Sequence, residues 1–135
     1  MKFSAVAFFA AVASADVVFK VSNFEAGCIP HSSQCRYSFG VIQPGTMETT
    51  PVTCTLLATS DGSLPAVTEG GCQDSSRTFS VTKGADGLTL TVSQPVTPSS
   101  NQTGSHLIPS SELETSDQPN ASVQTYTGPA EFDLE

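Results

Sequence analysis

The chain contains no tryptophan and few basic residues, and each shortage excludes a class of partner. Without tryptophan, and with phenylalanines at apparent core positions, it offers no obvious aromatic platform on which sugar rings would stack. Five basic residues stand against 13 acidic ones, which gives a formal net charge of −8 at pH 7. Nucleic acids and anionic membranes need a basic footprint, so we expect neither as a partner.

Motifs of several enzyme classes are also missing. The sequence has no Gly-x-Ser-x-Gly nucleophile elbow, no glycine-rich phosphate loop after a strand and no calcium-loop spacing. We interpret His31 as a loop residue and His106 as an exposed one. Catalysis by His31 with Cys28 or Cys35 would need a free thiol, and zinc binding there would need a fourth ligand. We therefore expect no enzymatic activity, no metal and no cofactor.

Three acidic residues alternate near the end of the sequence: Glu131, Asp133 and Glu135. This spacing places them on one face of a strand. We interpret that face as solvated. A weak calcium site is the alternative, because calcium prefers clustered oxygen ligands.

Residues 1–15 have the layout of a secretory signal peptide. Lys2 gives a positive start, Phe3–Val12 is almost entirely apolar, and Ala13-Ser14-Ala15 is a cleavage site of small residues. The apolar run is too short to span a bilayer, which needs about 20 residues. We expect a secreted, extracellular domain over 16–135 with no stable membrane association. Without Lys2 it has 4 basic and 13 acidic residues, a net charge of −9.

The four cysteines predict two disulfides, because they are even in number and lie in a chain with a secretory leader. Of the three possible connectivities we favour Cys28–Cys35 with Cys54–Cys72, in which each bond closes a short loop. A nested alternative joins Cys28 to Cys72 and Cys35 to Cys54.

Apolar residues recur with a period of two, which is the pattern of half-buried strands. No window of adequate length keeps the helical period. The sequence therefore predicts an all-β fold, a small disulfide-stapled antiparallel β-barrel or sandwich of about seven strands. The turn Gly84-Ala85-Asp86-Gly87 predicts a hairpin between two of them. The clearest strands are predicted at 16–23, 35–42, 51–59, 77–83 and 87–94.

The segment 93–122 differs in composition from the predicted strands. It is rich in serine, threonine and proline and poor in large apolar residues, so we expect a long surface excursion of a single domain. Leu107-Ile108 and Leu113 are its candidate anchors. It also holds two N-glycosylation acceptor tripeptides, which begin at Asn101 and Asn120.

The segment Phe24–Phe39, with Cys-Ile-Pro-His-Ser at 28–32, is the most distinctive part of the sequence. Together with Gly71–Asp74 and Phe79–Val81, it resembles secreted hypersensitive-response-inducing proteins of filamentous fungi, which elicit plant immunity. These are distantly similar to the β-barrel family of the major Alternaria allergen. The resemblance implies an extracellular, non-enzymatic protein that a plant host senses, and it carries over no catalytic residues.

We therefore expect a secreted elicitor or effector-like protein that acts by binding, as a monomer, to an unidentified host extracellular protein or receptor. The exposed recognition loop would lie between the first two cysteines and comprise Ile29, Pro30, His31 and Ser32. The alternative function is that of a cell-surface or extracellular structural protein, or of a β-barrel with a small ligand inside.

Overall fold

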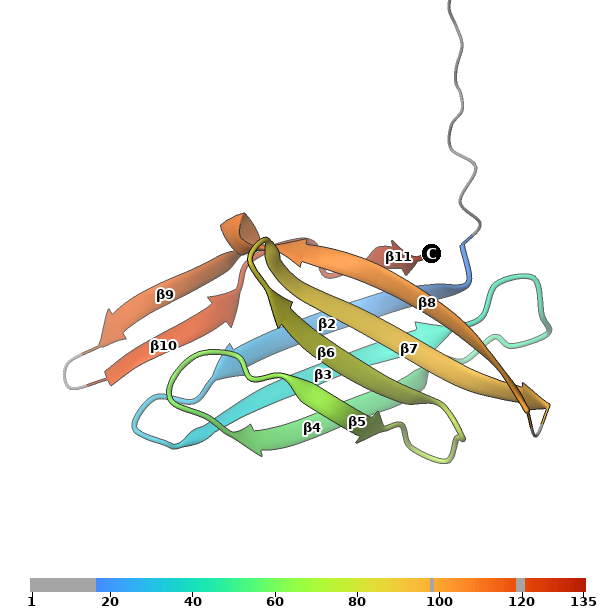
Figure 1. Cartoon of the computed structure of the whole chain (residues 1–135), viewed down its shortest axis with the longest axis horizontal. Coiled ribbons are helices and arrows are strands. Elements are labelled where there is room, and N and C mark those ends of the chain that lie inside the picture. Colours follow the sequence, from blue (N-terminus) through green and yellow to red (C-terminus); the bar gives the residue numbers. More distant parts are fainter. Residues whose placement is uncertain (1–16, 98, 119–120) are drawn as a thin grey trace, which may run out of the picture.

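A computed structural model describes residues 17–97, 99–118 and 121–135, so the predicted signal peptide and Asn120 lie outside the described residues. The described chain forms two antiparallel β-sheets packed face to face (Figure 1). Its elements are β2 Phe19–Cys28, β3 Gln34–Ile42, β4 Val52–Thr59, β5 Val67–Gly71, β6 Thr78–Gly84, β7 Gly87–Thr97, β8 Ser100–Pro109, the 3₁₀ turn η2 Ser110–Glu112, β9 Leu113–Gln118, β10 Ala121–Tyr126 and β11 Phe132–Leu134.

Strand alternation builds the core, as the sequence predicts. The larger sheet has the order β4-β3-β2-β10-β9, with β11 paired to one half of β2, and the smaller sheet has the order β5-β6-β7-β8. One face of each sheet is buried against the other, in keeping with the predicted sandwich. The most buried strand residues, each at most 3% exposed, are Phe19, Val21, Phe24, Cys35, Tyr37, Phe39, Val41, Cys54, Phe79, Val81, Leu88, Leu90, Val92, Ile108 and Leu134.

The predicted hairpin at Gly84–Gly87 is confirmed. Gly84, the last residue of β6, and Gly87, the first residue of β7, are register partners, and Ala85-Asp86 form the turn. Gly87 has a φ of 141°, a backbone conformation that other L-residues rarely adopt.

The prediction that residues 93–122 form a long surface excursion was wrong. This segment contains the end of β7, all of β8, η2 and β9, and the start of β10. As a result, the described chain has ten strands rather than about seven. Serine and threonine fill the solvent face of these strands, so few large apolar residues are needed. Of the candidate anchors, Ile108 is buried and Leu113 packs against the core, whereas Leu107 is 48% exposed.

The two predicted disulfides are confirmed, and the nested pairing is wrong. Cys28 and Cys35 are register partners in the β2–β3 hairpin, where their Cα atoms are 3.8 Å apart. Cys54 on β4 bonds to Cys72, which directly follows β5, so this bond joins the two sheets. Two disulfides fit an extracellular protein, because they persist in oxidising compartments.

At the opposite side of the sandwich, β11 connects the sheets through backbone hydrogen bonds. It pairs with β2, and Glu135 exchanges two hydrogen bonds of 3.0 Å with Ser105 on β8. These contacts do not close the sheets into a barrel. The interior is filled by packed side chains, and a ligand enclosed in a barrel therefore finds no support in the described part of the chain.

A buried arginine lies between the sheets at one end. Arg77 is 4% exposed, and its Nη2 donates to Glu48 Oε1 at 2.8 Å. Its Nη1 donates to the Val41 carbonyl at 3.3 Å, and its Nε donates to Gln94 Oε1. The guanidinium carbon lies 5.4 Å from the centroid of the Phe19 ring. A buried charge needs such partners, so the packing at this end of the sandwich depends on Glu48.

We expect Glu48→Gln to destabilise the fold at neutral pH by about 2 kcal/mol, less than the roughly 3–5 kcal/mol of a fully buried pair. Burial raises the pKa of Glu48, but hydrogen bonds from Arg77 and the Gln43 backbone, with the Arg77 charge, bring it below its ordinary value. Ionised Glu48 therefore stabilises the fold above the unfolded-state pKa of about 4.3, and this contribution is lost as the pH falls through the folded value.

Urea unfolding at several pH values measures this difference, which should shrink under acidic conditions. Glu25→Gln is the control. Both Glu25 and Arg36 are exposed, and at a distance of 3.8 Å their ion pair should contribute less than about 1 kcal/mol to the free energy of unfolding. An effect of Glu48→Gln that is equal at pH 7 and at acidic pH would contradict the assigned role.

Removal of the two disulfides should have unequal effects on stability. The Cys54–Cys72 bond spans 18 residues and the Cys28–Cys35 bond spans 7. In the chain-entropy model their loss costs roughly 3.2 and 2.4 kcal/mol, respectively. Paired Cys→Ala variants compared by denaturant unfolding test this order, and a larger loss for the shorter loop would refute it.

Candidate functional site

The predicted recognition loop, Ile29–Ser32, lies in the connection of residues 29–33, which is held at its base by a disulfide. It follows Cys28, and the Ile29 N–H donates to the Gln34 carbonyl at 2.9 Å. Inside the loop, the Ser32 N–H donates to the Ile29 carbonyl at 3.2 Å. Pro30 precedes His31, whose φ is 60°, and this is the pattern of a type II turn. The loop conformation is thus fixed by covalent and hydrogen bonds.

All five residues of this connection are exposed, which confirms the predicted exposure of Ile29, Pro30, His31 and Ser32. Ile29 is an apolar side chain with 40% exposure. In Figure 1 the loop connects β2 and β3 at the end of the sandwich near the β9–β10 hairpin. Its role in recognition stays a prediction.

A second apolar side chain lies on the adjoining outer face of the larger sheet. Thr125, Gly27, Arg36 and Leu57 form one register row across β10, β2, β3 and β4. Leu57 is 51% exposed. We call these four residues together with Ile29 the Arg36 surface.

Two grooves flank Arg36 on this surface. One, of about 390 Å³, is lined by Gly27, Ile29, Arg36 and Thr125 among others. The other, of about 310 Å³, lies between Arg36 and Leu57. A methyl group on Gly27 would make ordinary van der Waals contact with the Thr125 side chain, at 3.6 Å, and would occupy part of the first groove.

Arg36 is the cation of this surface and is only weakly engaged. Its Nη1 lies 3.8 Å from Glu25 Oε1, and the two side chains are 55% and 74% exposed. An exposed pair at this distance contributes at most about 1 kcal/mol. The guanidinium is therefore available to a partner at little energetic cost.

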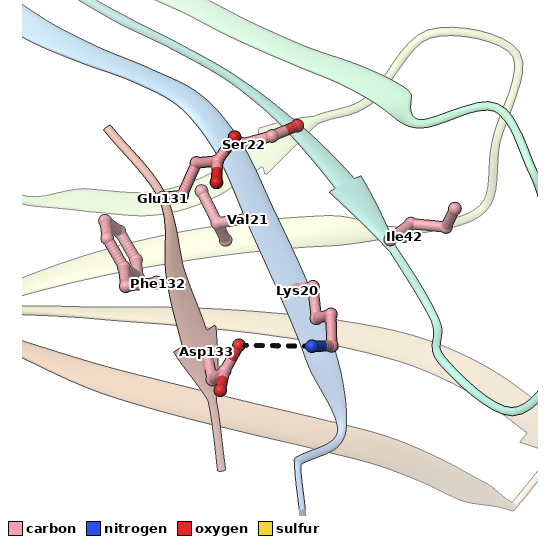
Figure 2. Close-up of a pocket in the computed structure, with 7 residues that line it drawn as sticks. All are labelled: Lys20, Val21, Ser22, Ile42, Glu131, Phe132 and Asp133. Carbon is pink, nitrogen blue, oxygen red and sulfur yellow. Dashed lines mark ion pairs between the residues drawn. The ribbon is translucent and has the colours of Figure 1, made fainter. Parts of the chain in front are cut away.

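A further groove, of about 440 Å³, lies where β11, β2 and β3 meet (Figure 2). Its outer row is Asp133, Lys20 and Ile42, which are register partners. Lys20 Nζ lies 4.0 Å from Asp133 Oδ1, and both side chains are about half exposed. Glu131 also lines the groove and, like Asp133 and Glu135, is exposed. This agrees with the interpretation of a solvated acidic face.

The described residues contain no group of three or more acidic, histidine or cysteine side chains that would hold a metal ion. They also contain no helix long and apolar enough to cross a membrane. All four cysteines are disulfide-bonded, so neither Cys28 nor Cys35 is a thiol nucleophile for His31.

The interpretation of His106 as a plainly exposed residue was wrong. On β8 it is half-buried and stacks on Phe132 of β11, with ring centroids 4.1 Å apart and planes at 15°. Burial lowers the pKa of His106, although the charges of Glu112, Glu135 and Asp133 act in the opposite direction. At neutral pH the ring is thus an uncharged packing partner for β11.

Beside this ring pair, Glu112 Oε1 is buried without a hydrogen-bond partner among the described residues. A Cβ on Gly128 would lie 2.6 Å from that oxygen. The neighbouring Tyr126 hydroxyl donates to the Pro129 carbonyl at 2.6 Å. Burial, and secondarily the charge of Glu112, raises the pKa of Tyr126 to about 12. The Tyr126 phenol therefore stays protonated to a higher pH than an ordinary tyrosine.

Sequence reasoning missed Arg36 and Leu57 as neighbours of the loop. Leu57 occupies a solvent-facing position of β4, out of phase with the buried Cys54. A leucine at such a position was the available signal. Its proximity to Arg36 depends on the register between β3 and β4, which the pattern did not specify.

We expect the pKa of His106 to lie below its ordinary value of about 6.5. The unfolded chain then binds a proton more readily, so stability should fall as the pH decreases from about 6.5 toward the folded-state pKa. NMR titration of the ring and unfolding at several pH values measure both effects. His106→Phe keeps the stacking and should remove this part of the pH dependence. A measured pKa above 6.5 would contradict the burial argument.

Comparison of the sequence with protein-family models and with curated proteins finds no match to either. The resemblance to fungal elicitors rests on the residues quoted for it and stays a prediction.

Proposed function

We propose that this protein is secreted and acts by binding a host extracellular protein through the Arg36 surface and the 29–33 loop. The observation that carries the proposal is the convergence of a conformationally fixed loop, two exposed apolar side chains and two flanking grooves at one end of the sandwich.

The composition of the surface supports protein binding. Ile29 and Leu57 are 40% and 51% exposed, and a partner that covers them would gain hydrophobic free energy of about 25 cal/mol per Å². Arginine is among the residues that most often dominate interface energetics, and Arg36 lies between the two grooves. An apolar partner side chain in each groove would leave Arg36 at the centre of the contact.

The rigidity of the loop favours affinity. The Cys28–Cys35 bond and the turn at Pro30-His31 restrict the loop before any partner arrives. A preorganised loop loses less conformational entropy on binding than a flexible one. This argument predicts that recognition depends on the folded, oxidised protein.

The identity of the host rests on the sequence. The predicted signal peptide and the two disulfides support an extracellular location. The resemblance of Phe24–Phe39 to hypersensitive-response-inducing proteins supports a plant as the host and elicitation as the outcome.

Leaf infiltration with purified Asp16–Glu135, beside a reduced and alkylated sample, tests this proposal. We expect cell death or defence signalling from the folded protein alone. Activity of both samples would mean that the host detects a linear peptide, with Phe24–Phe39 as the first segment to synthesise. Inactivity of both in several plants would reject the elicitor function.

Substitutions on the Arg36 surface localise the activity. We expect Ile29→Ser and Leu57→Ser each to weaken binding or elicitation by about tenfold, since loss of a central apolar contact costs roughly 1–2 kcal/mol. His31→Gly tests the loop while tolerating the positive φ. Leu107→Ser is the matched control, because Leu107 is 48% exposed on the other sheet.

Circular dichroism and thermal unfolding show whether each variant keeps the fold. Full activity of the folded Ile29, His31 and Leu57 variants would remove this surface from the proposal. Equal loss in the Leu107 control would show that the effect is not specific to the surface.

A further inference from the structure

Strand β8, the terminal strand of the smaller sheet, carries an acceptor tripeptide for N-linked glycosylation. Asn101 and Thr103 are both exposed, whereas Gln102 between them accepts a hydrogen bond of 2.5 Å from Gln43. Asn101 and Thr103, which define the motif, therefore both face solvent. The side chain of Gln102 between them holds the strand to Gln43. A glycan at Asn101 requires no change in the fold.

The strand itself carries no charged side chain that would oppose pairing with other strands. β8 is the terminal strand of the smaller sheet. It contains no aspartate, glutamate, lysine or arginine, and its Leu107 is 48% exposed. Charged side chains are the common means by which proteins prevent edge-to-edge association. An uncharged edge with an exposed leucine needs another form of cover.

The strand hydrogen bonds identify which part of the edge is open. Both backbone groups of Ser105 bond to Glu135, on the side away from β7. The direction of backbone hydrogen bonding alternates from one residue to the next along an antiparallel strand. The backbone groups of Asn101 and Thr103 therefore point away from β7, as those of Ser105 do. Glu135 covers the edge at Ser105, and among the described residues no backbone group bonds to Asn101 or Thr103 on that side.

We propose that Asn101 carries an N-linked glycan that shields this open edge of β8; the proposal rests on the proposed secretion. The donor is a lipid-linked oligosaccharide diphosphate. A bond forms between Asn101 Nδ2 and the anomeric carbon of the first sugar, and the bond from that carbon to the diphosphate oxygen breaks. The lipid diphosphate leaves, and the amide nitrogen loses one proton.

The position of Asn101 leaves the Arg36 surface free. Asn101 lies at the β7–β8 tip, where it pairs with Pro95, and the 29–33 loop lies at the other end of the long axis (Figure 1). A glycan there protects the edge without covering Ile29 or Leu57.

Expression of the full chain in a yeast secretory host tests occupancy. A second version carries a host leader in place of residues 1–15, so that entry into the pathway does not depend on the native leader. Peptide mass mapping after enzymatic deglycosylation in heavy-oxygen water should mark Asn101. Thr103→Ala should abolish the mark while leaving Asn101 in place. An unmodified Asn101 in the secreted protein would overturn the proposal, whatever the infiltration result.

Whether the glycan shields the β8 edge is tested by measuring self-association of the protein with and without it. We expect Asn101→Gln to elute as larger species at rising concentration, while the glycosylated protein stays unchanged. Asn120→Gln is the matched control for loss of a second acceptor. If Asn101→Gln remains as monomeric as the glycosylated protein, the shielding role is refuted.

A glycan placed on the proposed binding surface provides the converse experiment. Leu57→Asn creates an acceptor motif with Ala58 and Thr59. We expect glycosylated Leu57→Asn to lose elicitation at least about tenfold relative to the same variant after enzymatic removal of its glycan, and the native glycan at Asn101 to leave elicitation unchanged within about twofold. Equal inhibition by both glycans would refute the separation of the two sites.

Discussion

The burial of one face of each sheet against the other is the constraint on which the structure depends. The inner residues of β2, β3, β6 and β7 alternate with solvent-facing ones, and only their mutual packing removes these apolar side chains from water. The Cys54–Cys72 bond and the β2–β11–β8 contacts hold the sheets together at their two sides. The outer faces are then free to carry small polar residues and, at one end, the Arg36 surface.

Arg77 shows how polar chemistry supports this packing. Because its charge lies between the sheets, it has to be paired with the Glu48 carboxylate. Its other N–H groups are satisfied by neutral oxygen acceptors. Glu48 belongs to the connection between β3 and β4, and the ion pair thereby fixes a loop to the core. The arrangement gives this end of the sandwich a defined geometry that apolar contacts alone do not specify.

Alternation in the sequence was sufficient to predict the central strands, because Tyr37, Phe39 and Leu90 mark the buried faces directly. It failed for β8 and β9, whose solvent-facing serines and threonines resemble a loop in composition. The 29–33 loop was predictable from its cysteines and proline. The positions of Arg36 and Leu57 beside it were not, since they depend on strand register across β2, β3 and β4.

The pairing of β2 with β11 has a consequence for the order in which the chain folds. These strands come from opposite ends of the described chain, yet Phe19 and Leu134 are register partners. The larger sheet is incomplete until residues 132–134 have been synthesised, and such long-range pairing is slow. This order suits the secretion that we propose, because a chain that stays unfolded until residues 132–134 are present is able to pass through a narrow translocation channel.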